Sequence, residues 1–230
     1  LLPKVFSEEK LEKKILLTID DGYNSFYENA WPYLKENKIP FLIFISTEAI
    51  GKNGYMDWKK IKDIEQYDFV TIGNHSHSHD YLVNFSFNEF EQDIIKSIEI
   101  FNSKLGYNPI FFSYPFGEYS LEQKKYIADK FNYAFGQHSG VIDLNKDKYE
   151  LPRFPINEKY GDLERFSFLL NLSPLEYKNL IPEEKYILKN NNPPKTVIEF
   201  FEGQKNIDRI NCFSDEGKGW DKSKIKLIDN

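Results

Sequence analysis

Residues 15–22 read ILLTIDDG, a run of apolar and β-branched residues that ends in two aspartates and a glycine. A continuous apolar run of this length is typical of a strand that is buried on both faces, as in a parallel sheet covered by helices. A second run of the same kind, FLIFI, lies at Phe41–Ile45, and an amphipathic stretch separates the two. This pattern predicts strands that alternate with helices.

The alternation continues through roughly the first 155 residues. In the helix expected after residue 88, apolar side chains recur at a spacing of about 3.6 residues, which buries one face. An open doubly wound sheet and a (β/α) barrel both fit, and in both folds functional residues gather at the C-terminal ends of the strands. We expect strands at residues 15–19, 41–45, 69–72, 110–114 and 133–137, a candidate sixth at 151–154, and helices at 25–37, 58–66, 88–105 and 121–131.

The character of the sequence changes near residue 190. The stretch NNNPP at Asn190–Pro194 has the composition of a linker, and three short apolar segments separated by Gly and Asn follow it. We predict a first domain over residues 1–189 and a β-rich extension over 190–230, which is either a structural addition or an incomplete accessory module. Its expected strands are Thr196–Phe201, Ile207–Phe213 and Lys222–Ile228.

Bulk composition excludes several classes of protein. A net charge of −6 argues against nucleic-acid binding, which needs clustered Lys and Arg. The single cysteine, Cys212, excludes an internal disulfide, and no apolar stretch is long enough to cross a membrane. The first residues, LLPKVFSEEK, are too charged for a signal peptide. The cell envelope or periplasm and the cytoplasm stay open as compartments, as does the oligomeric state.

Three polar clusters follow expected strands. Asp20-Asp21-Gly22 follows the first strand, the sequence HSHSHD at residues 75–80 follows the third, and YPFG at residues 114–117 follows the fourth. Alone, Asp-Asp-Gly is more typical of a turn or a helix cap, and a histidine-rich segment can be a solvated loop. Together at one edge of a sheet, these clusters indicate an active site.

The residue types in these clusters suit a catalytic metal. His75 and His79 are spaced i, i+4, which places two imidazoles on one side of a turn, whereas His77 between them is expected to face solvent or substrate. Two His and one carboxylate leave coordination positions open, as in catalytic zinc sites where the metal activates water. Of the adjacent aspartates, we expect one to bind the metal and the other to take the proton from water.

The motifs TIDDG, GNHSHSH and FFSYPFG, in this order, resemble the first three motifs of the polysaccharide deacetylase family, the NodB homology domain. The similarity covers about residues 14–155. The resemblance implies a distorted (β/α) barrel of the NodB type with seven or so strands, here carrying a short C-terminal β extension. It also implies a divalent metal, with Zn²⁺ as the first choice and Co²⁺ or Ni²⁺ as alternatives.

The resemblance also implies roles for particular residues. Asp20 matches the catalytic base, Asp21, His75 and His79 match the metal ligands, and Ser76 matches a hydroxyl residue that braces the histidine loop. The backbone N–H of Phe116 stands where the family holds the oxyanion. Substrate contacts are expected from Tyr114, Pro115 and Tyr119.

The sequence departs from the family pattern in three places. Ser113 stands where the third motif usually has an arginine that contacts the base; Arg153 either supplies this guanidinium or is a surface residue. The usual Asp-Trp motif is not evident. The Leu-x-His motif that provides the general acid is absent, which leaves His138 either as the acid or as an uninvolved loop residue, and some relatives bring the acid from a permuted position.

The activity that the resemblance implies is hydrolysis of the C–N bond of N-acetylated sugars in a polysaccharide or glycan. Its partner is a carbohydrate that contains N-acetylhexosamine, although related sequences also act on O-acetyl groups or small amides. One alternative is a deacetylase-like protein that binds glycans without turnover. Another is a non-haem Fe(II) oxygenase, which the strand-helix pattern disfavours.

Overall fold

The computed structural model describes residues 14–215 and 217–228, and the contacts within it divide the chain into two compact units. The first unit extends to Leu175 and includes Glu183–Pro194, whereas the second contains Glu176–Pro182 and the chain from Lys195. The predicted boundary at residue 190 therefore differs from the observed division. The N-terminal segment in which no signal peptide was recognised lies outside the described residues.

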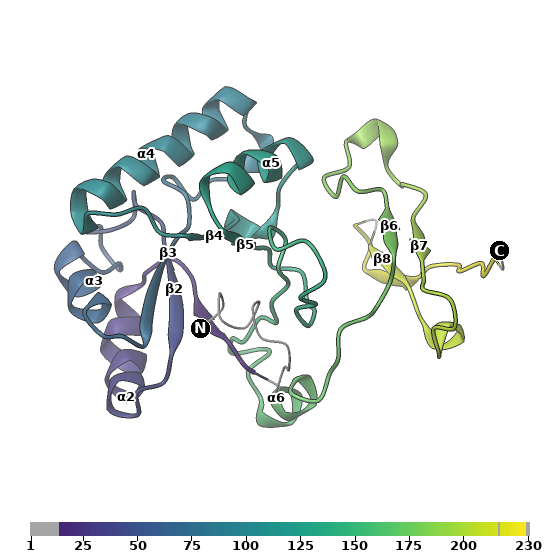
Figure 1. Cartoon of the computed structure of the whole chain (residues 1–230), viewed down its shortest axis with the longest axis horizontal. Coiled ribbons are helices and arrows are strands. Elements are labelled where there is room, and N and C mark those ends of the chain that lie inside the picture. The colour runs from purple at the N-terminus through teal and green to yellow at the C-terminus, as the bar shows by residue number, and fades with distance from the viewer. Residues whose placement is uncertain (1–13, 216, 229–230) are drawn as a thin grey trace. The chain divides into compact units, whose positions relative to one another are not determined.

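One five-stranded parallel sheet forms the centre of the first unit (Figure 1). The spatial order of its strands equals their order in the chain. A doubly wound sheet reverses its strand order partway, whereas a barrel wall does not. The sheet is thus a curled half-barrel of the predicted (β/α) type. Its strands are β1 (Leu17–Ile19), β2 (Phe41–Ile45), β3 (Val70–Asn74), β4 (Phe111–Ser113) and β5 (Tyr133–Phe135).

The structure describes fewer strands in this sheet than the family resemblance implied. The candidate strand at residues 151–154 is reduced to a single parallel bridge between Leu151 and Phe135. Pro152 follows directly, and because proline has no N–H it cannot continue the ladder. The chain therefore crosses the edge of β5 at one point and continues into the loop that carries Arg153.

The α-helices of the first unit other than α2 begin at side-chain caps. The side chain of Asp57 accepts from Lys60 N at the start of α3, and Ser86 and Ser120 each complete a capping box at the start of α4 and α5. A π-helical turn at Phe26–Ala30 precedes α2, so the helix expected at residues 25–37 is present but irregular. The helices are α2 (Trp31–Glu36), α3 (Trp58–Glu65), α4 (Phe87–Leu105), α5 (Leu121–Lys130) and α6 (Leu163–Leu169).

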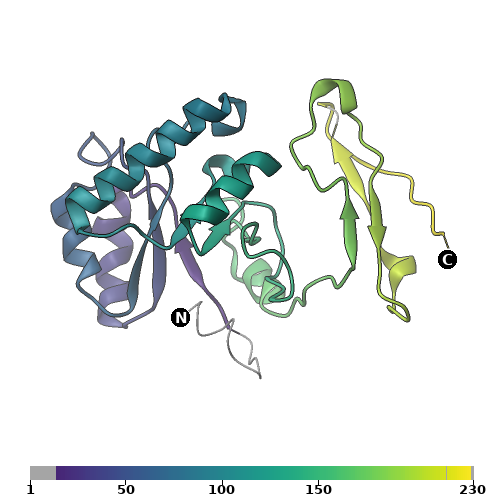
Figure 2. The same ribbon diagram turned by 45° about the horizontal axis from the view of Figure 1, so that its top comes forward.

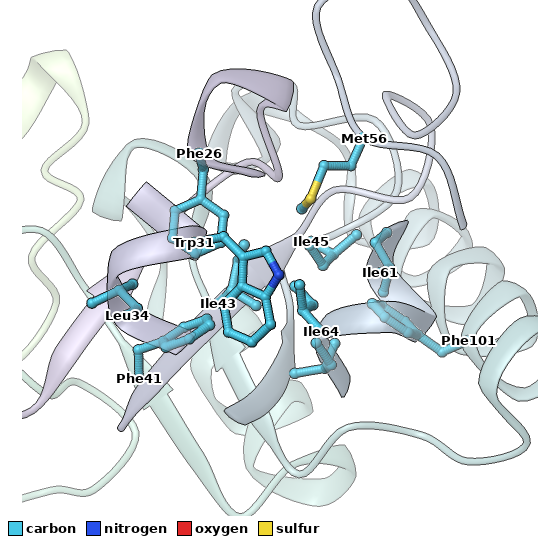
Figure 3. Packing of buried hydrophobic residues seen from close by; sticks show 11 residues of the cluster. Phe26, Trp31, Leu34, Phe41, Ile43, Ile45, Met56, Ile61, Ile64 and Phe101 are labelled. Atoms are coloured by element: carbon cyan, nitrogen blue, oxygen red, sulfur yellow. The ribbon is translucent and has the colours of Figure 1, made fainter. Parts of the chain in front are cut away.

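Alternate side chains of the strands enter separate layers of the core. Ile43 and Ile45 of β2 pack with α2, α3 and Phe101 of α4 in one cluster (Figure 3), and Figure 2 shows these helices gathered along the outer side of the sheet. The neighbouring residues Leu42 and Phe44 point to the inner face, where they pack with Phe135. This alternation follows from the two-residue period of a strand, and it leaves the C-terminal edge of the sheet free to carry polar loops.

The second unit is a small β structure. Strand β6 (Asn179–Ile181) pairs with β7 (Val197–Glu199), and β8 (Phe213–Asp215) pairs with β9 (Trp220–Lys222), both antiparallel. The expectation of a β-rich extension is met, but two of its predicted strands are wrong. Residues 207–209 form a 3₁₀ turn, and the chain after Lys222 is not in a strand. Strand β6 is not predicted from the sequence, because its short, largely exposed segment has no apolar run.

Within the described residues, no helix combines the length and the apolar character that crossing a membrane requires.

The core cluster around α4 gives a first prediction. Phe101 is fully buried, and its ring meets that of Trp58 edge-on at 5.9 Å. Phe101→Ala should lower the free energy of unfolding by about 3–5 kcal/mol, because a cavity remains where the ring was. Urea denaturation followed by circular dichroism measures this. Phe168→Ala is the matched control, since Phe168 is largely exposed and its loss should change stability by less than about 0.5 kcal/mol.

Candidate metal centre and active site

Asp20 and Asp21 lie in a tight turn at the end of β1. Gly22 N donates to Asp20 O at 3.0 Å, and both Asp21 (φ 74°) and Gly22 (φ 79°) have left-handed backbone conformations. A Cβ at residue 22 would lie 3.0 Å from Cδ1 of Ile45, so the position requires glycine on both steric counts. The turn directs neighbouring carboxylates differently, one toward Arg153 and the other toward the histidines.

His75 directly follows β3 and is completely buried. Its Nδ1 lies 2.7 Å from the carbonyl oxygen of Ser113, which can only accept, so Nδ1 carries the proton and Nε2 presents a lone pair. Burial is the main cause that lowers the pKa of His75, despite the nearby carboxylates. The ring is therefore neutral at pH 7, as a metal ligand must be.

The histidine loop is held in a strained conformation by side chains from several elements. Ser76 (φ 67°) and His79 (φ 58°) both have left-handed backbones, and Ser76 Oγ accepts from His79 N at 3.1 Å, the bracing contact that the resemblance implied. Asp93 of α4 accepts from His77 N at 2.8 Å and from Ser78 N at 3.0 Å. The loop is thus fixed to a helix, and the positions of His75 and His79 are fixed with it.

Asp21, His75 and His79 converge on one point. Asp21 Oδ1 lies 3.1 Å from His79 Nε2 and 3.5 Å from His75 Nε2, and the two Nε2 atoms are 3.2 Å apart. A tetrahedral ion with bonds of about 2.0–2.1 Å separates its ligand atoms by about 3.4 Å, close to these values. Asp21 Oδ1 is buried and accepts no hydrogen bond within the described part of the chain. The three residues therefore fit a divalent cation that prefers nitrogen and oxygen ligands.

Arg153 forms a two-pronged ion pair with Asp20. Nη1 lies 2.7 Å from Oδ1 and Nη2 lies 2.8 Å from Oδ2. Nη2 also donates to Ser113 Oγ at 3.0 Å, so the guanidinium occupies space that the small side chain of Ser113 leaves. Burial would raise the pKa of Asp20, but the hydrogen bonds and the positive charge of Arg153 oppose this and hold the pKa below its ordinary value. The carboxylate is therefore ionised and able to accept a proton.

Asp20 also lies beside the candidate ligands. Its Oδ2 is 4.0 Å from His75 Nε2, although it is not among the three atoms that converge. The two adjacent carboxylates therefore differ in position: Asp21 belongs to the converging group and Asp20 lies next to it, and the roles that the resemblance implies for them stay a prediction.

Phe116 lies in a 3₁₀ turn at Pro115–Gly117, with a left-handed backbone (φ 57°). A Cβ at Gly117 would approach Gln137 N to 2.3 Å, so the turn packs directly against the loop after β5. The N–H of Phe116 has no hydrogen-bond acceptor among the described residues. Its ring lies against His79, with centroids 5.0 Å apart, at the edge of the candidate metal centre.

The structure places Tyr114, Pro115 and Tyr119, from which substrate contacts were expected, in the interior, and a contact of these residues with a substrate stays a prediction. All three side chains are buried, and the rings of Tyr114 and Tyr119 pack together 4.4 Å apart. Tyr114 donates to Tyr149 O, and Tyr119 donates to Glu150. These residues support the Phe116 turn from within the core. Their rings follow a buried strand closely, and there they are stabilised by packing rather than by contact with solvent.

Two histidines differ from expectation in other ways. His77 is buried, not exposed or facing a substrate, because its ring turns inward and its Nδ1 lies 2.9 Å from Thr47 Oγ1. His138 is exposed, and its carbonyl oxygen accepts from Arg153 N at 3.0 Å. In the described chain, no hydrogen bond or ion pair joins its ring to Asp20, Asp21, His75 or His79, so its role as an acid stays a prediction.

Asp93 is the functional residue that the sequence analysis missed. It lies on the same face of α4 as the buried residues Phe90, Ile94 and Phe101. A carboxylate within an apolar helical stripe is rare unless it is paired. The presence of a carboxylate in this otherwise apolar stripe is the feature of the sequence that could have identified Asp93.

The fold and site can now be compared with known proteins. The chain has the fold of a Streptococcus pyogenes deacetylase, with a TM-score of 0.68 and 20% identity over 74% of this chain and 77% of the other. The polysaccharide deacetylase family profile matches residues 7–136, more than half of the sequence. The chain belongs to the polysaccharide deacetylase family.

Two characterised relatives give the family context. A peptidoglycan-N-acetylglucosamine deacetylase of Bacillus cereus is 31% identical over 54% of this chain and 44% of its own. A poly-β-1,6-N-acetyl-D-glucosamine N-deacetylase of Staphylococcus aureus is 25% identical over 64% of this chain and 56% of its own. The chain thus spans about half the length of the curated relatives that it matches.

The convergence of three side chains predicts which histidines bind a metal. His79→Ala should abolish tight binding of one Zn²⁺, because only Asp21 and His75 remain, whereas His77→Ala should retain it. Isothermal titration of metal-stripped protein with Zn²⁺ measures the stoichiometry and affinity of both variants. The assignment fails if His79→Ala still binds one Zn²⁺ as tightly as the unaltered protein.

Proposed function

We propose that this chain is a metal-dependent hydrolase that removes acetyl groups from N-acetylated sugars of a polysaccharide or glycan. The observation that carries the proposal is the carboxylate of Asp20, which is held by Arg153 beside the converging atoms of Asp21, His75 and His79. A site that only bound glycans would not need a half-buried, oriented carboxylate next to a cation site. The substrates named for the relatives support an N-acetylhexosamine glycan as the substrate class.

The residues present fit a divalent cation, with Zn²⁺ as the first choice and Co²⁺ or Ni²⁺ as alternatives, held by Asp21, His75 and His79. When bound, such a cation supplies Lewis acidity, which lowers the pKa of water and polarises a carbonyl group. Two imidazoles and one carboxylate leave room in its coordination sphere for reactants.

The remaining steps use groups of the chain itself. Asp20 takes a proton from the water that adds to the acetyl carbonyl carbon, and the fork of Arg153 keeps its carboxylate oriented throughout. The N–H of Phe116, which has no other acceptor among the described residues, donates to the oxygen that becomes negative. The C–N bond then breaks, and acetate and the protonated amine are released.

The amine needs a proton as it leaves, and His138 is the proposed donor. Its support is its place in the loop after β5, where its carbonyl oxygen is hydrogen-bonded to the backbone of Arg153. The ring is exposed and has no hydrogen-bond partner among the described residues that would prevent it from turning toward a substrate.

The proposal is tested by acetate release. Metal-stripped protein, resupplied with Zn²⁺ or Co²⁺, is assayed on N-acetylglucosamine oligomers. Asp20→Asn should release acetate about 10²- to 10⁴-fold more slowly, because an amide cannot accept the proton, and should still bind the metal. Asp80→Asn, with an exposed carboxylate beyond the histidine loop, is the control and should keep full activity. Metal-dependent binding of these oligomers without any acetate release would favour the glycan-binding alternative.

The guanidinium of Arg153 gives a separate prediction. Arg153→Lys should lower kcat by about 100-fold with little change in Zn²⁺ binding, because one ammonium group cannot make the paired hydrogen bonds that orient Asp20. Steady-state kinetics together with zinc titration separate the two effects. Arg165→Lys is the matched control, since its guanidinium donates to the carbonyls of Pro155 and Tyr160 and lies over the Tyr160 ring, away from Asp20. An unchanged kcat in Arg153→Lys would mean that Asp20 does not depend on this contact.

A further inference from the structure

Four aromatic side chains lie at the C-terminal edge of the sheet, one in each loop that follows β1, β2, β3 and β4. They are Tyr23, Tyr55, Tyr81 and Phe116. The proposed chemistry uses the backbone N–H of Phe116 but none of the four rings. Tyr114 and Tyr119, by contrast, are buried in the core. The side chains of Tyr23, Tyr81 and Phe116 are 44%, 45% and 41% exposed.

The four rings form two stacked pairs. Tyr81 and Phe116 lie nearly parallel, with centroids 4.2 Å apart and 15° between their planes. Tyr23 and Tyr55 lie 4.8 Å apart at 25°. Each pair joins loops from neighbouring strands, one at the β1–β2 side of the sheet edge and the other at the β3–β4 side.

Both pairs are fixed by the backbone beneath them. An antiparallel bridge links residues 23 and 55, and hydrogen bonds from Asn24 N to Gly54 O at 2.8 Å and from Met56 N to Gly22 O at 3.0 Å flank it. On the other side, Gly117 N donates to Tyr114 O at 2.9 Å within the Phe116 turn. Rigid rings lose little conformational freedom when a ligand stacks on them, which favours binding.

The residues of the candidate metal centre come from two loops that each also carry one ring of a pair. Tyr23 follows Asp21 by two residues at the end of β1, and Phe116 lies against His79, which follows β3. Phe116 has His79 and Tyr81 as ring partners, so Tyr81 is the outer ring of its pair. Each pair therefore adjoins one residue of the metal centre, Tyr23 through Asp21 and Phe116 through His79, so a ligand with one group at that centre has an aromatic pair beside each of these residues.

We infer that the Tyr81–Phe116 and Tyr23–Tyr55 pairs are two sugar-binding platforms that hold the neighbours of the sugar being deacetylated. The apolar C–H face of a neutral pyranose packs well on an exposed aromatic face, and the platforms themselves carry no charged group. The substrate is then a chain of at least three sugars, deacetylated at an internal residue, and a free monosaccharide is a poor substrate. This inference rests on the proposed deacetylase function and specifies its substrate class.

The test compares N-acetylglucosamine oligomers of one to five sugars, in β-1,4- and β-1,6-linked series. In the unaltered protein, kcat/KM should rise between the monosaccharide and the trisaccharide and then level off. Tyr81→Ala and Tyr55→Ala should each lower this gain roughly threefold to tenfold, mainly through KM, since each removes one stacking contact. Tyr81→Trp should restore the gain, because it keeps an aromatic face.

Tyr33→Ala is the matched control, since Tyr33 is a 63% exposed tyrosine on α2 that takes no part in either pair. Its dependence on oligomer length should equal that of the unaltered protein. Zinc stoichiometry and melting temperature are measured for every variant, so that a variant that has lost its metal or its fold is recognised as such.

A binding measurement separates this inference from the deacetylase proposal. Calorimetric titration of the zinc-loaded Asp20→Asn variant with the tetrasaccharide should show binding that Tyr81→Ala weakens. Equal kcat/KM for the monosaccharide and the tetrasaccharide would contradict the sugar-binding role of the two pairs and would not affect the proposed deacetylase function. Tetrasaccharide binding that depends on Tyr81 without acetate release would support the platforms and overturn the deacetylase. The absence of both oligosaccharide binding and acetate release, in the β-1,4- and the β-1,6-linked series, would contradict the platforms and the deacetylase proposal together.

Discussion

The two-pronged contact between Arg153 and Asp20 is the interaction on which the rest of the site depends. The same guanidinium donates to Thr18 Oγ1 of β1, to Ser113 Oγ of β4 and to the carbonyl oxygen of Gly136 after β5. In the described part of the chain β1 and β5 are not hydrogen-bonded neighbours, so the curled sheet is open between them. One side chain thus spans this opening and orients the base, with the rings of Phe44 and Phe135 beneath it.

Backbone strain is concentrated around the candidate metal centre. Four of the six non-glycine residues with positive φ in the described chain are Asp21, Ser76, His79 and Phe116. Each such conformation costs on the order of 1 kcal/mol, so it persists only where the surroundings determine it. Asp93 supplies that support for the histidine loop, and the core rings under the Phe116 turn supply it there. The strained loop conformations at the candidate metal centre therefore depend on the buried side chains that support them.

The strands of the sheet and the convergence of the three polar clusters could be predicted from the sequence, because apolar runs and the residues that follow them are local patterns. Arg153 could also be named from the sequence as a possible source of the guanidinium beside Asp20. The sequence did not predict which side of each loop a residue faces. Tyr114 and His77 were expected at the surface, yet both are buried by contacts with Tyr149 and Thr47 that are distant in the chain. The short strands of the second unit failed for a related reason, since their largely exposed residues carry weak periodicity.

The hydrogen bond from Arg153 to Ser113, which stands where the family resemblance implies an arginine, couples two positions that are 40 residues apart in the chain. Ser113 is fully buried, and its hydroxyl touches the guanidinium that arrives from Arg153. The space beside Asp20 holds one guanidinium, so a second arginine at 113 would be crowded out and the loss of the one at 153 would leave the carboxylate unpaired. The effect of a substitution at either position therefore depends on the residue at the other, an epistatic coupling that a comparison of sequences one position at a time would miss.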